Sequence, residues 1–286
     1  MPKSSSKSIQ VLEKKDNEIR LQISGYPVVL VNALRRLALS DVPTLAVDFL
    51  HIYENSSSVF DEILAHRMGL VVLDSSEAIK KLKSPEECIN ADESDESCFV
   101  KLILNVEVDE KEQQGRYVLA GEIAIDSNIT RIVYPETPLL YLIPGQRVHA
   151  VAYARLGRGK EHSKWSPATV AILRYSTQVN YDGSKASKEC LKCLQSYPDL
   201  VKKLKSKSKG TIEIPPDTNT SGLLYCAESE CSGAIEVVYS EDKLILTIES
   251  SGALPPEKIV LESIEALESR AKALLASLKE AKGEGM

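Results

Sequence analysis

The sequence has few aromatic residues and no long hydrophobic run, and both shortages narrow the class of protein. Phe, Trp and Tyr together make up 5% of the 286 residues. No apolar segment approaches the roughly 18 to 20 residues that a membrane-crossing helix needs. The polar first residues, MPKSSSKSIQ, lack the hydrophobic core of a signal peptide. We therefore expect a soluble, cytoplasmic protein with no membrane partner.

Motifs for common catalytic chemistry are also missing. The sequence contains no Gly-rich phosphate loop, no HExxH zinc helix and no recognisable Ser/His/Asp set. The basic stretch GRGK at 157–160 lacks the Walker spacing and is expected to be a surface loop. A net charge of −6 argues against a general nucleic-acid coat protein, which is normally basic. A lysine run at 185–209 has no interleaved aromatic residues, so we expect it to be solvated.

The composition nevertheless permits a sizeable folded core. Apolar residues account for 43% of the chain, and the length suits one large domain or about two or three smaller ones. Alternating residues at 8–24 predict two short strands joined by a turn. The segments that follow mix helical and strand-like patterns.

A short amphipathic helix is predicted between Pro27 and Pro43. Pro27 suits a first helical turn, and Pro43 excludes the preceding residue from helical geometry. Three leucines at helical spacing form an apolar stripe: Leu30, Leu34 and Leu37. Arg35 and Arg36 could reach acidic or carbonyl groups at its rim, or they could simply be solvated. An apolar stripe beside two guanidinium groups favours packing against another protein chain.

Strands dominate residues 44–164. The strand-like segments are LAVDFLHIYEN, KLILNVEVDE, YVLAGEIAI and QRVHAVAYARL. Between the first two lies a helical segment, for which Ser58 and Asp61 suggest a capping box and Gly69 an end. The stretch EECINADESDES has six acidic residues and no basic one, so a solvated loop is expected. WSPATVAILRYSTQV, at 165–179, indicates a further strand.

The last third of the chain holds a loop-rich segment and a long helix. Residues 180–234 contain four of the six cysteines, and AIEVVYS and KLILTIESSG after them look like a hairpin. A helix is expected from about Pro256. Its apolar residues step by four and three: Val260, Ile264, Leu267, Ala271, Leu274 and Leu278. Such a seam either packs on the protein's own sheet or pairs with a helix of a partner.

Four of the cysteines form a candidate metal site. Cys190 and Cys193 form a CxxC motif, and Cys226 and Cys231 follow 33 and 38 residues after Cys193. This spacing is a moderate signal for zinc or an iron–sulfur cluster. In a reducing compartment, a disulfide framework is not expected. An iron–sulfur cluster, zinc, and buried thiols without metal all remain open.

The sequence NALRRLALSDVPTLAVDFLHIYENSSSVFDEILAHRMGLVVL resembles the signature of the alpha-like subunits of multisubunit RNA polymerases. The similarity is to the family of the archaeal D-type subunits and their eukaryotic third-largest-subunit equivalents. Val72 departs from the family, whose members often carry proline after HR-x-G-L. The resemblance implies an α+β fold in which a split dimerisation domain carries an inserted strand-rich domain and a small ferredoxin-like domain. The implied segments are 1–43 and 235–286 for the two dimerisation halves, 44–164 for the insert, 165–179 for a return strand and 180–234 for the ferredoxin-like domain.

The family resemblance also implies a function. Such a subunit pairs with the smaller alpha-like subunit L, and the pair, with subunits N and P, forms a platform for the second-largest catalytic subunit. Nucleotidyl transfer belongs to the large subunits, so no catalytic residue is expected in this chain, and DNA is met only through the assembled enzyme. The leucine stripe, Arg35, Arg36 and the seam of the terminal helix are the implied partner interface.

For the cysteines, the resemblance favours iron and sulfur. CLKCLQSYP looks like a ferredoxin motif whose third position is Ser196, and CSGAIEV after Cys231 is similar to the segment that follows a second ferredoxin motif. Cys190, Cys193 and Cys231 would then share one cluster, 3Fe-4S or 4Fe-4S, with Cys226 as a displaced fourth ligand. The alternative function is a ferredoxin-type electron-transfer protein. Eukaryotic relatives bind zinc with four cysteines near Cys88 and Cys98, but two cysteines do not suffice.

Overall fold

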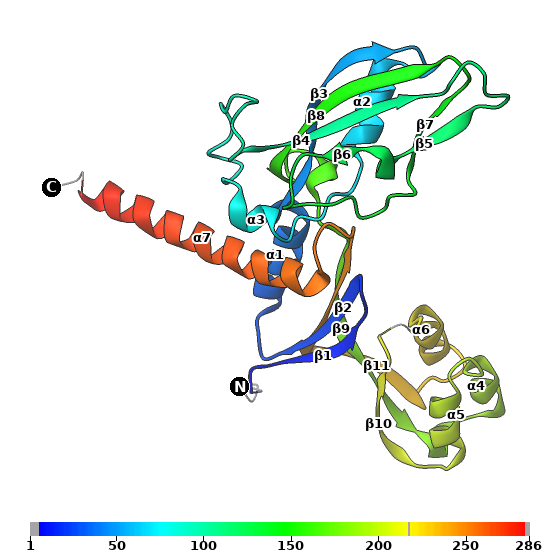
Figure 1. The fold of residues 1–286 in the computed structure, drawn as a ribbon. Coiled ribbons are helices and arrows are strands. Elements are labelled where there is room, and N and C mark those ends of the chain that lie inside the picture. Colours follow the sequence, from blue (N-terminus) through cyan, green and yellow to red (C-terminus); the bar gives the residue numbers. More distant parts are fainter. Residues whose placement is uncertain (1–5, 217, 284–286) are drawn as a thin grey trace. The chain divides into compact units, whose positions relative to one another are not determined.

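The computed structural model describes residues 6–216 and 218–283 as two compact units of mixed α and β structure (Figure 1). The first unit combines the N-terminal residues up to Glu13 with Arg20–Asn32 and Ile172–Thr247. The second combines Lys14–Ile19 and Ala33–Ala171 with the residues from Ile248 onward. Each unit is therefore assembled from segments far apart in the sequence.

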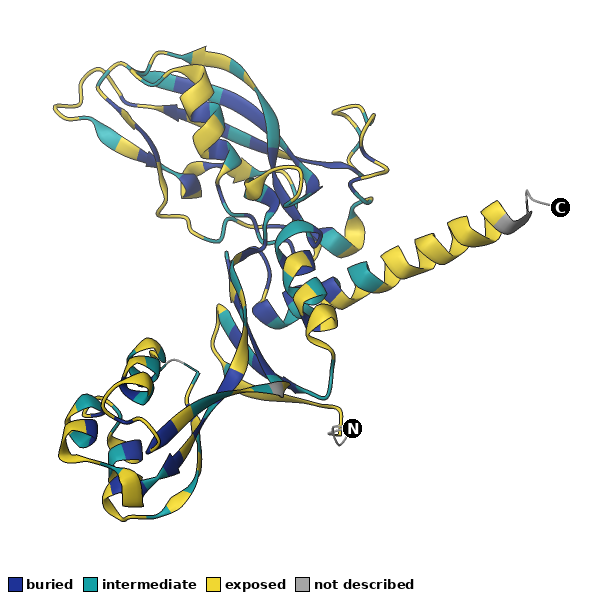
Figure 2. Ribbon diagram, turned by 180° about the vertical axis from the view of Figure 1, so that it is seen from behind, coloured by how far each residue is buried: buried dark blue, intermediate teal, exposed yellow. Residues whose placement is uncertain are grey.

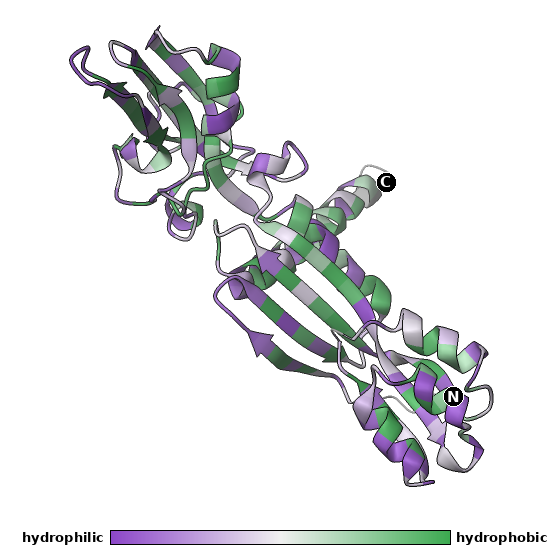
Figure 3. Ribbon diagram, turned by 90° about the vertical axis from the view of Figure 1, so that its right-hand side faces the viewer, coloured by the Kyte–Doolittle hydropathy of each residue, from purple (hydrophilic) through white to green (hydrophobic). Residues whose placement is uncertain are grey.

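The first unit is built on a five-stranded sheet. Its strands, in spatial order, are β1 (Ser8–Lys14), β2 (Glu18–Ser24), β11 (Ile235–Ser250), β9 (Ala168–Asp182) and β10 (Lys209–Ile214). In β2, every second residue is buried, as an antiparallel sheet with one covered face requires. Figure 3 shows the corresponding stripes of apolar and polar residues along these strands.

A small helical module extends from this sheet over residues 183–234. It contains η3 (Gly183–Lys185), α4 (Lys188–Cys193), α5 (Pro198–Lys205) and α6 (Ser221–Glu228). The Ser187 Oγ caps α4 by accepting from the Cys190 N–H at 2.9 Å, and Pro198 occupies the first turn of α5. The loop-rich character predicted for this segment was wrong, because these short helices pack their leucines around a core of their own.

The second unit contains a four-stranded sheet and a two-stranded sheet. The larger sheet has the order β3 (Pro43–Asn55), β8 (Arg147–Arg158), β4 (Phe99–Glu107) and β6 (Ala124–Ile125); the smaller one pairs β5 (Arg116–Leu119) with β7 (Pro138–Leu142). The pairing of β3 with β8 runs from Pro43 opposite Arg158 to Asn55 opposite Val148, with two β-bulges. The short helices of this unit are α2 (Asp61–Gly69), α3 (Ala78–Lys81), η1 (Ala120–Glu122) and η2 (Ser163–Trp165).

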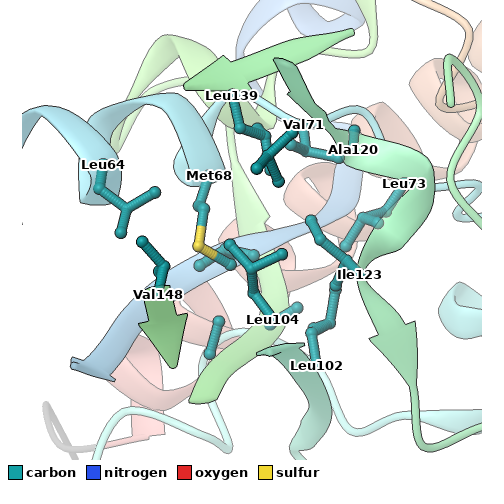
Figure 4. Packing of buried hydrophobic residues seen from close by; sticks show 14 of the residues in the cluster. Leu64, Met68, Val71, Leu73, Leu102, Leu104, Ala120, Ile123, Leu139 and Val148 are labelled. Carbon is teal, nitrogen blue, oxygen red and sulfur yellow. The ribbon is translucent and has the colours of Figure 1, made fainter. Parts of the chain in front are cut away.

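The largest core of the protein lies between this sheet and α2. Leu64 and Met68 of α2 are fully buried and point toward Leu102, Leu104 and Val148 of the strands (Figure 4). Burying a leucine or methionine side chain is worth about 1.5 to 3 kcal/mol. This core therefore gives the second unit a rigid centre.

Two further helices, α1 (Val28–Ser40) and α7 (Pro256–Gly283), carry the residues predicted to form a partner interface. The first turns of α7 pack against the rest of the second unit: Ile259 is fully buried, and the Lys258 Nζ donates to the Ser76 carbonyl at 2.8 Å. From residue 268 to 281, every residue of α7 is exposed, as the yellow end of this helix in Figure 2 shows. The predicted start of the helix near Pro256 is confirmed.

Other predictions of local structure need correction. The segment expected to form a hairpin is one continuous strand, β11, because no Gly or Pro stands at 241–243 to reverse the chain. The capping box at Ser58 and Asp61 was wrong, since α2 follows Phe60 without a side-chain cap. YVLAGEIAI is interrupted by η1. In the part of the chain that the structure describes, no helix combines the length and apolar character that crossing a membrane requires.

Candidate functional site

The leucine stripe of α1 is divided between the protein's core and its surface. Leu30 is 38% exposed and Leu34 is half-buried, whereas Leu37 is 4% exposed. The end of the helix is thus already covered by this chain. Of the three leucines, only Leu30 and Leu34 leave apolar surface accessible to solvent.

The two arginines of α1 also differ. Arg35 is partly buried, and its Nη1 donates to the Ala171 carbonyl of β9 at 3.4 Å. Arg36 is exposed. The angle of about 100° between successive helical residues separates them. Arg36 is therefore the more accessible of the two at the surface of the protein.

The apolar seam of α7 is largely uncovered. Val260 and Leu267 are half-buried, and Ala271 is exposed. The other seam residues are more than two-fifths exposed: Ile264 at 43%, Leu274 at 62% and Leu278 at 52%. Leu261 and Leu275, which the heptad count left out, are exposed as well, at 59% and 58%. The wider apolar face would have been found by counting every leucine of the helix.

A buried carboxylate connects α7 to the end of α1. Asp41 is 4% exposed and accepts hydrogen bonds from the Arg270 guanidinium and the Ser40 hydroxyl. The Arg158 guanidinium donates to the Asp41 carbonyl from β8. A buried charge needs such partners, so this cluster holds the middle of α7 against the end of α1. Asp41 and Arg270 are 229 positions apart, and no motif in the sequence signals a pair at that distance.

The four cysteines of the helical module come together, as a shared site requires, but they do so as disulfides. Cys190 pairs with Cys231, and Cys193 pairs with Cys226, with Cα separations of 4.7 and 5.9 Å. Three of the four lie at 3% exposure or less. Because Cys190 and Cys193 are one turn apart on α4, the two bonds are neighbours. The prediction that a disulfide framework is absent was wrong.

This pairing bears directly on the predicted metal site. A metal or an iron–sulfur cluster takes cysteine as thiolate, and a sulfur in an S–S bond has no thiolate to give. Within residues 6–216 and 218–283, no set of three His, Cys, Asp or Glu side chains is placed to hold a metal ion. The residues as they stand do not fit the cluster that the ferredoxin-like motif predicted. Geometry brought the thiols close enough to pair, which the spacing could not reveal.

The third disulfide joins Cys88, near the start of the acidic stretch, to Cys98, which directly follows its end. Both sulfur-bearing residues are buried, at 4% and 1% exposure. The stretch itself is a loop, as predicted, but it is not simply solvated. Its Glu86 pairs with Arg158 at 2.9 Å, and its Glu93 with His51 at 2.7 Å. In the sequence, the two cysteines near the ends of this acidic stretch were the signal for the disulfide, whereas no motif signalled the ion pairs.

Comparison with known proteins agrees with this architecture. The model of the RNA polymerase Rpb3/Rpb11 dimerisation domain matches residues 20–271. DNA-directed RNA polymerase subunit Rpo3 of Aeropyrum pernix is 52% identical over 272 residues, which cover 95% of each chain. Rpo3 of Methanothermobacter thermautotrophicus is 33% identical over 93% of this chain and 97% of its own length. DNA-directed RNA polymerase II subunit rpb3 of Dictyostelium discoideum is 32% identical, with 97% and 95% covered. The chain therefore belongs to the Rpb3/Rpo3 family of RNA polymerase subunits.

Proposed function

We propose that this protein is a non-catalytic assembly subunit of a DNA-directed RNA polymerase. In this role it forms a heterodimer with a small alpha-like subunit of the L type. The heterodimer, with subunits of the N and P types, then supports assembly of the second-largest subunit. The chain contributes to a nucleotidyltransferase without supplying catalytic residues, and it meets DNA only through the assembled enzyme. Membership of the Rpb3/Rpo3 family supports this proposal.

The observation that carries the proposal is the uncovered face of α7. Its last turns expose Leu274, Leu275 and Leu278, each by more than half. Covering one leucine is worth about 1.5 to 3 kcal/mol, so leaving several in water is costly unless a partner chain buries them. A seam with spacings of three and four fits a facing helix. Leu30, Leu34 and Arg36 of α1 extend the proposed interface, with Arg35 as a positioning residue.

The proposed organisation gives the cysteine-containing segment a structural role. Residues 180–234 form the small appended domain, 44–164 the inserted domain, and 1–43, 165–179 and 235–286 the dimerisation domain. Electron transfer of the ferredoxin type needs three or four cysteine thiolates in this segment, and all four are joined in S–S bonds. No observation favours that alternative function.

The test is co-expression with a candidate L-type subunit, followed by affinity purification. Leu34→Asp and the double variant Leu274→Asp/Leu278→Asp should each lower recovery of the partner at least tenfold, because a carboxylate would be buried without a counter-charge. Ser269→Asp is the control: it adds one carboxylate, as each single leucine substitution does, to the exposed part of α7 on the side away from the seam. Full recovery with both sets of leucine variants would reject the proposed interface.

A further inference from the structure

The four-stranded sheet has an aromatic cluster on the face opposite the main core. Phe49 of β3 stacks on Tyr153 of β8, with ring centroids 5.1 Å apart and planes at 18°. Phe99 of β4 meets both rings edge-on, at 5.7 and 6.4 Å. His51 continues the row along β3, with its ring 5.8 Å from that of Phe49. These side chains alternate with the residues that face the core, so they form a second apolar surface.

The acidic loop, residues 85–98, lies on this cluster. Ala91 packs against it together with Cys88 and Cys98. Glu93 reaches the His51 ring, with Oε2 2.7 Å from Nε2. Partial burial raises the pKa of the Tyr153 phenol, and the nearby Glu93 carboxylate raises it further. The loop thus covers an aromatic surface with a mainly anionic segment.

Besides the Glu93–His51 contact, a backbone hydrogen bond from Lys83 to Ser97, ion pairs and a disulfide hold the loop in place. Ion pairs anchor it at both ends: Glu86 with Arg158 at 2.9 Å, and Asp95 with Lys83 at 3.1 Å. The Lys83–Asp95 pair is partly exposed and is worth little in water. The Glu86–Arg158 pair is bidentate and its Arg158 side chain is only 20% exposed, so it holds the start of the loop, outside the ring that the Cys88–Cys98 disulfide closes. The six carboxylates of the loop also repel one another. The Cys88–Cys98 disulfide is therefore the strongest constraint on the loop.

We propose that residues 85–98 are a redox-controlled cover on the aromatic face of this sheet, which the Cys88–Cys98 disulfide keeps closed. Opening needs a dithiol reductant. One of its thiolates attacks a sulfur of the S–S bond, which forms a mixed disulfide and releases the first cysteine. Its second thiolate then attacks the reductant's own sulfur in that mixed disulfide and releases the second cysteine. The dithiol ends as a disulfide, and Cys88 and Cys98 gain two electrons and two protons as thiols. Cys98 stays next to β4, while the rest of the loop is released and uncovers Phe49 and Tyr153.

Cleavage by a glutamate-specific protease reports the release of the loop, because Glu93 and Glu96 are exposed within it. The full-length protein treated with dithiothreitol should be cut there at least tenfold faster than the untreated protein. The double variant Cys88→Ser/Cys98→Ser should be cut equally fast without reductant, while its other two disulfides remain. Adding dithiothreitol to the variant should not change the cleavage rate at Glu93 and Glu96 any further, although it also reduces the two disulfides of the helical module. Equal rates in the variant and the untreated parent would overturn the proposal.

A second measurement separates a cover from a loop that is merely mobile. Hydroxyl-radical labelling, read by mass spectrometry, should increase at least threefold at Phe49 and Tyr153 on reduction. Tyr53 is the internal control, because it is 66% exposed with the loop closed and should not change. Unchanged labelling of Phe49 and Tyr153 would refute the cover, even where cleavage accelerates. If the double variant does not fold, both the proteolysis and the labelling are compared between the reduced and the untreated parent protein.

Discussion

Removing the Cys193–Cys226 disulfide should loosen the helical module without disturbing the rest of the protein. The two disulfides of the module are nested, with sequence separations of 33 and 41. The outer one, Cys190–Cys231, closes a ring that chain-entropy reasoning values at about 4 kcal/mol. With that ring closed, the inner disulfide adds only a small ring, from 190 to 193 and from 226 to 231.

By the same chain-entropy reasoning, closing a ring of about 10 residues stabilises the folded module by about 2.7 kcal/mol. The double variant Cys193→Ser/Cys226→Ser should therefore open its module about a hundredfold more often. Removing all four cysteines should cost about 7 kcal/mol, which is more than a module of this size is expected to withstand. The small core around Leu200 and Leu204 cannot compensate for that loss.

Trypsin provides the assay, since α5 carries Lys202, Lys203 and Lys205 as cleavage sites inside the module. When the module opens and closes faster than trypsin cuts, the cleavage rate follows the open fraction. We expect cleavage within α5 to accelerate about a hundredfold in the double variant. Cys88→Ser/Cys98→Ser serves as the control and should leave this rate unchanged. An acceleration of less than about threefold would refute the reasoning, because the disulfide would then add almost nothing to the closed state.

Two further predictions concern ion pairs of the second unit. Arg270→Ala should lower the free energy of unfolding by about 1 to 3 kcal/mol in urea titrations, because it strips a partner from the buried Asp41. Lys272→Ala removes only an exposed pair and should cost less than about 0.5 kcal/mol; equal losses would contradict this account. The hydrogen bond from Arg158 lowers the pKa of Glu86 from its ordinary 4.5, so this pair stabilises the fold above that value, and the contribution is lost as pH falls through the lowered pKa. Glu86→Gln should therefore make hydrogen exchange of the acidic loop, corrected for intrinsic rates, less sensitive to acid than in the parent.

Local sequence patterns predicted most of the regular structure. Prolines bounded α1, the period of two marked β3, β4 and β8, and the three–four spacing marked α7. These features follow from short-range sterics and from the need to bury one face of each element. The same reasoning failed at β11, where two apolar runs looked like a hairpin. Whether a strand continues depends on the strands that pair with it. The neighbours of β11 in the sheet are β2 and β9, which are distant from it in the sequence, so a local pattern does not reveal them.

The candidate sites depended more on tertiary structure. Four cysteines allow three pairings, and their spacing alone favoured a metal. The fold placed Cys190 and Cys193 of α4 beside Cys226 of α6 and Cys231, which follows α6, with the paired Cα atoms within disulfide reach. Likewise, three equally spaced leucines of α1 looked equivalent, but the fold buries Leu37 and leaves Leu30 exposed. The sequence by itself determined which faces are apolar, because that is a property of neighbouring residues. Only the tertiary structure decided which of those faces this chain covers and which it leaves exposed, because burial is set by contacts between segments distant in the sequence.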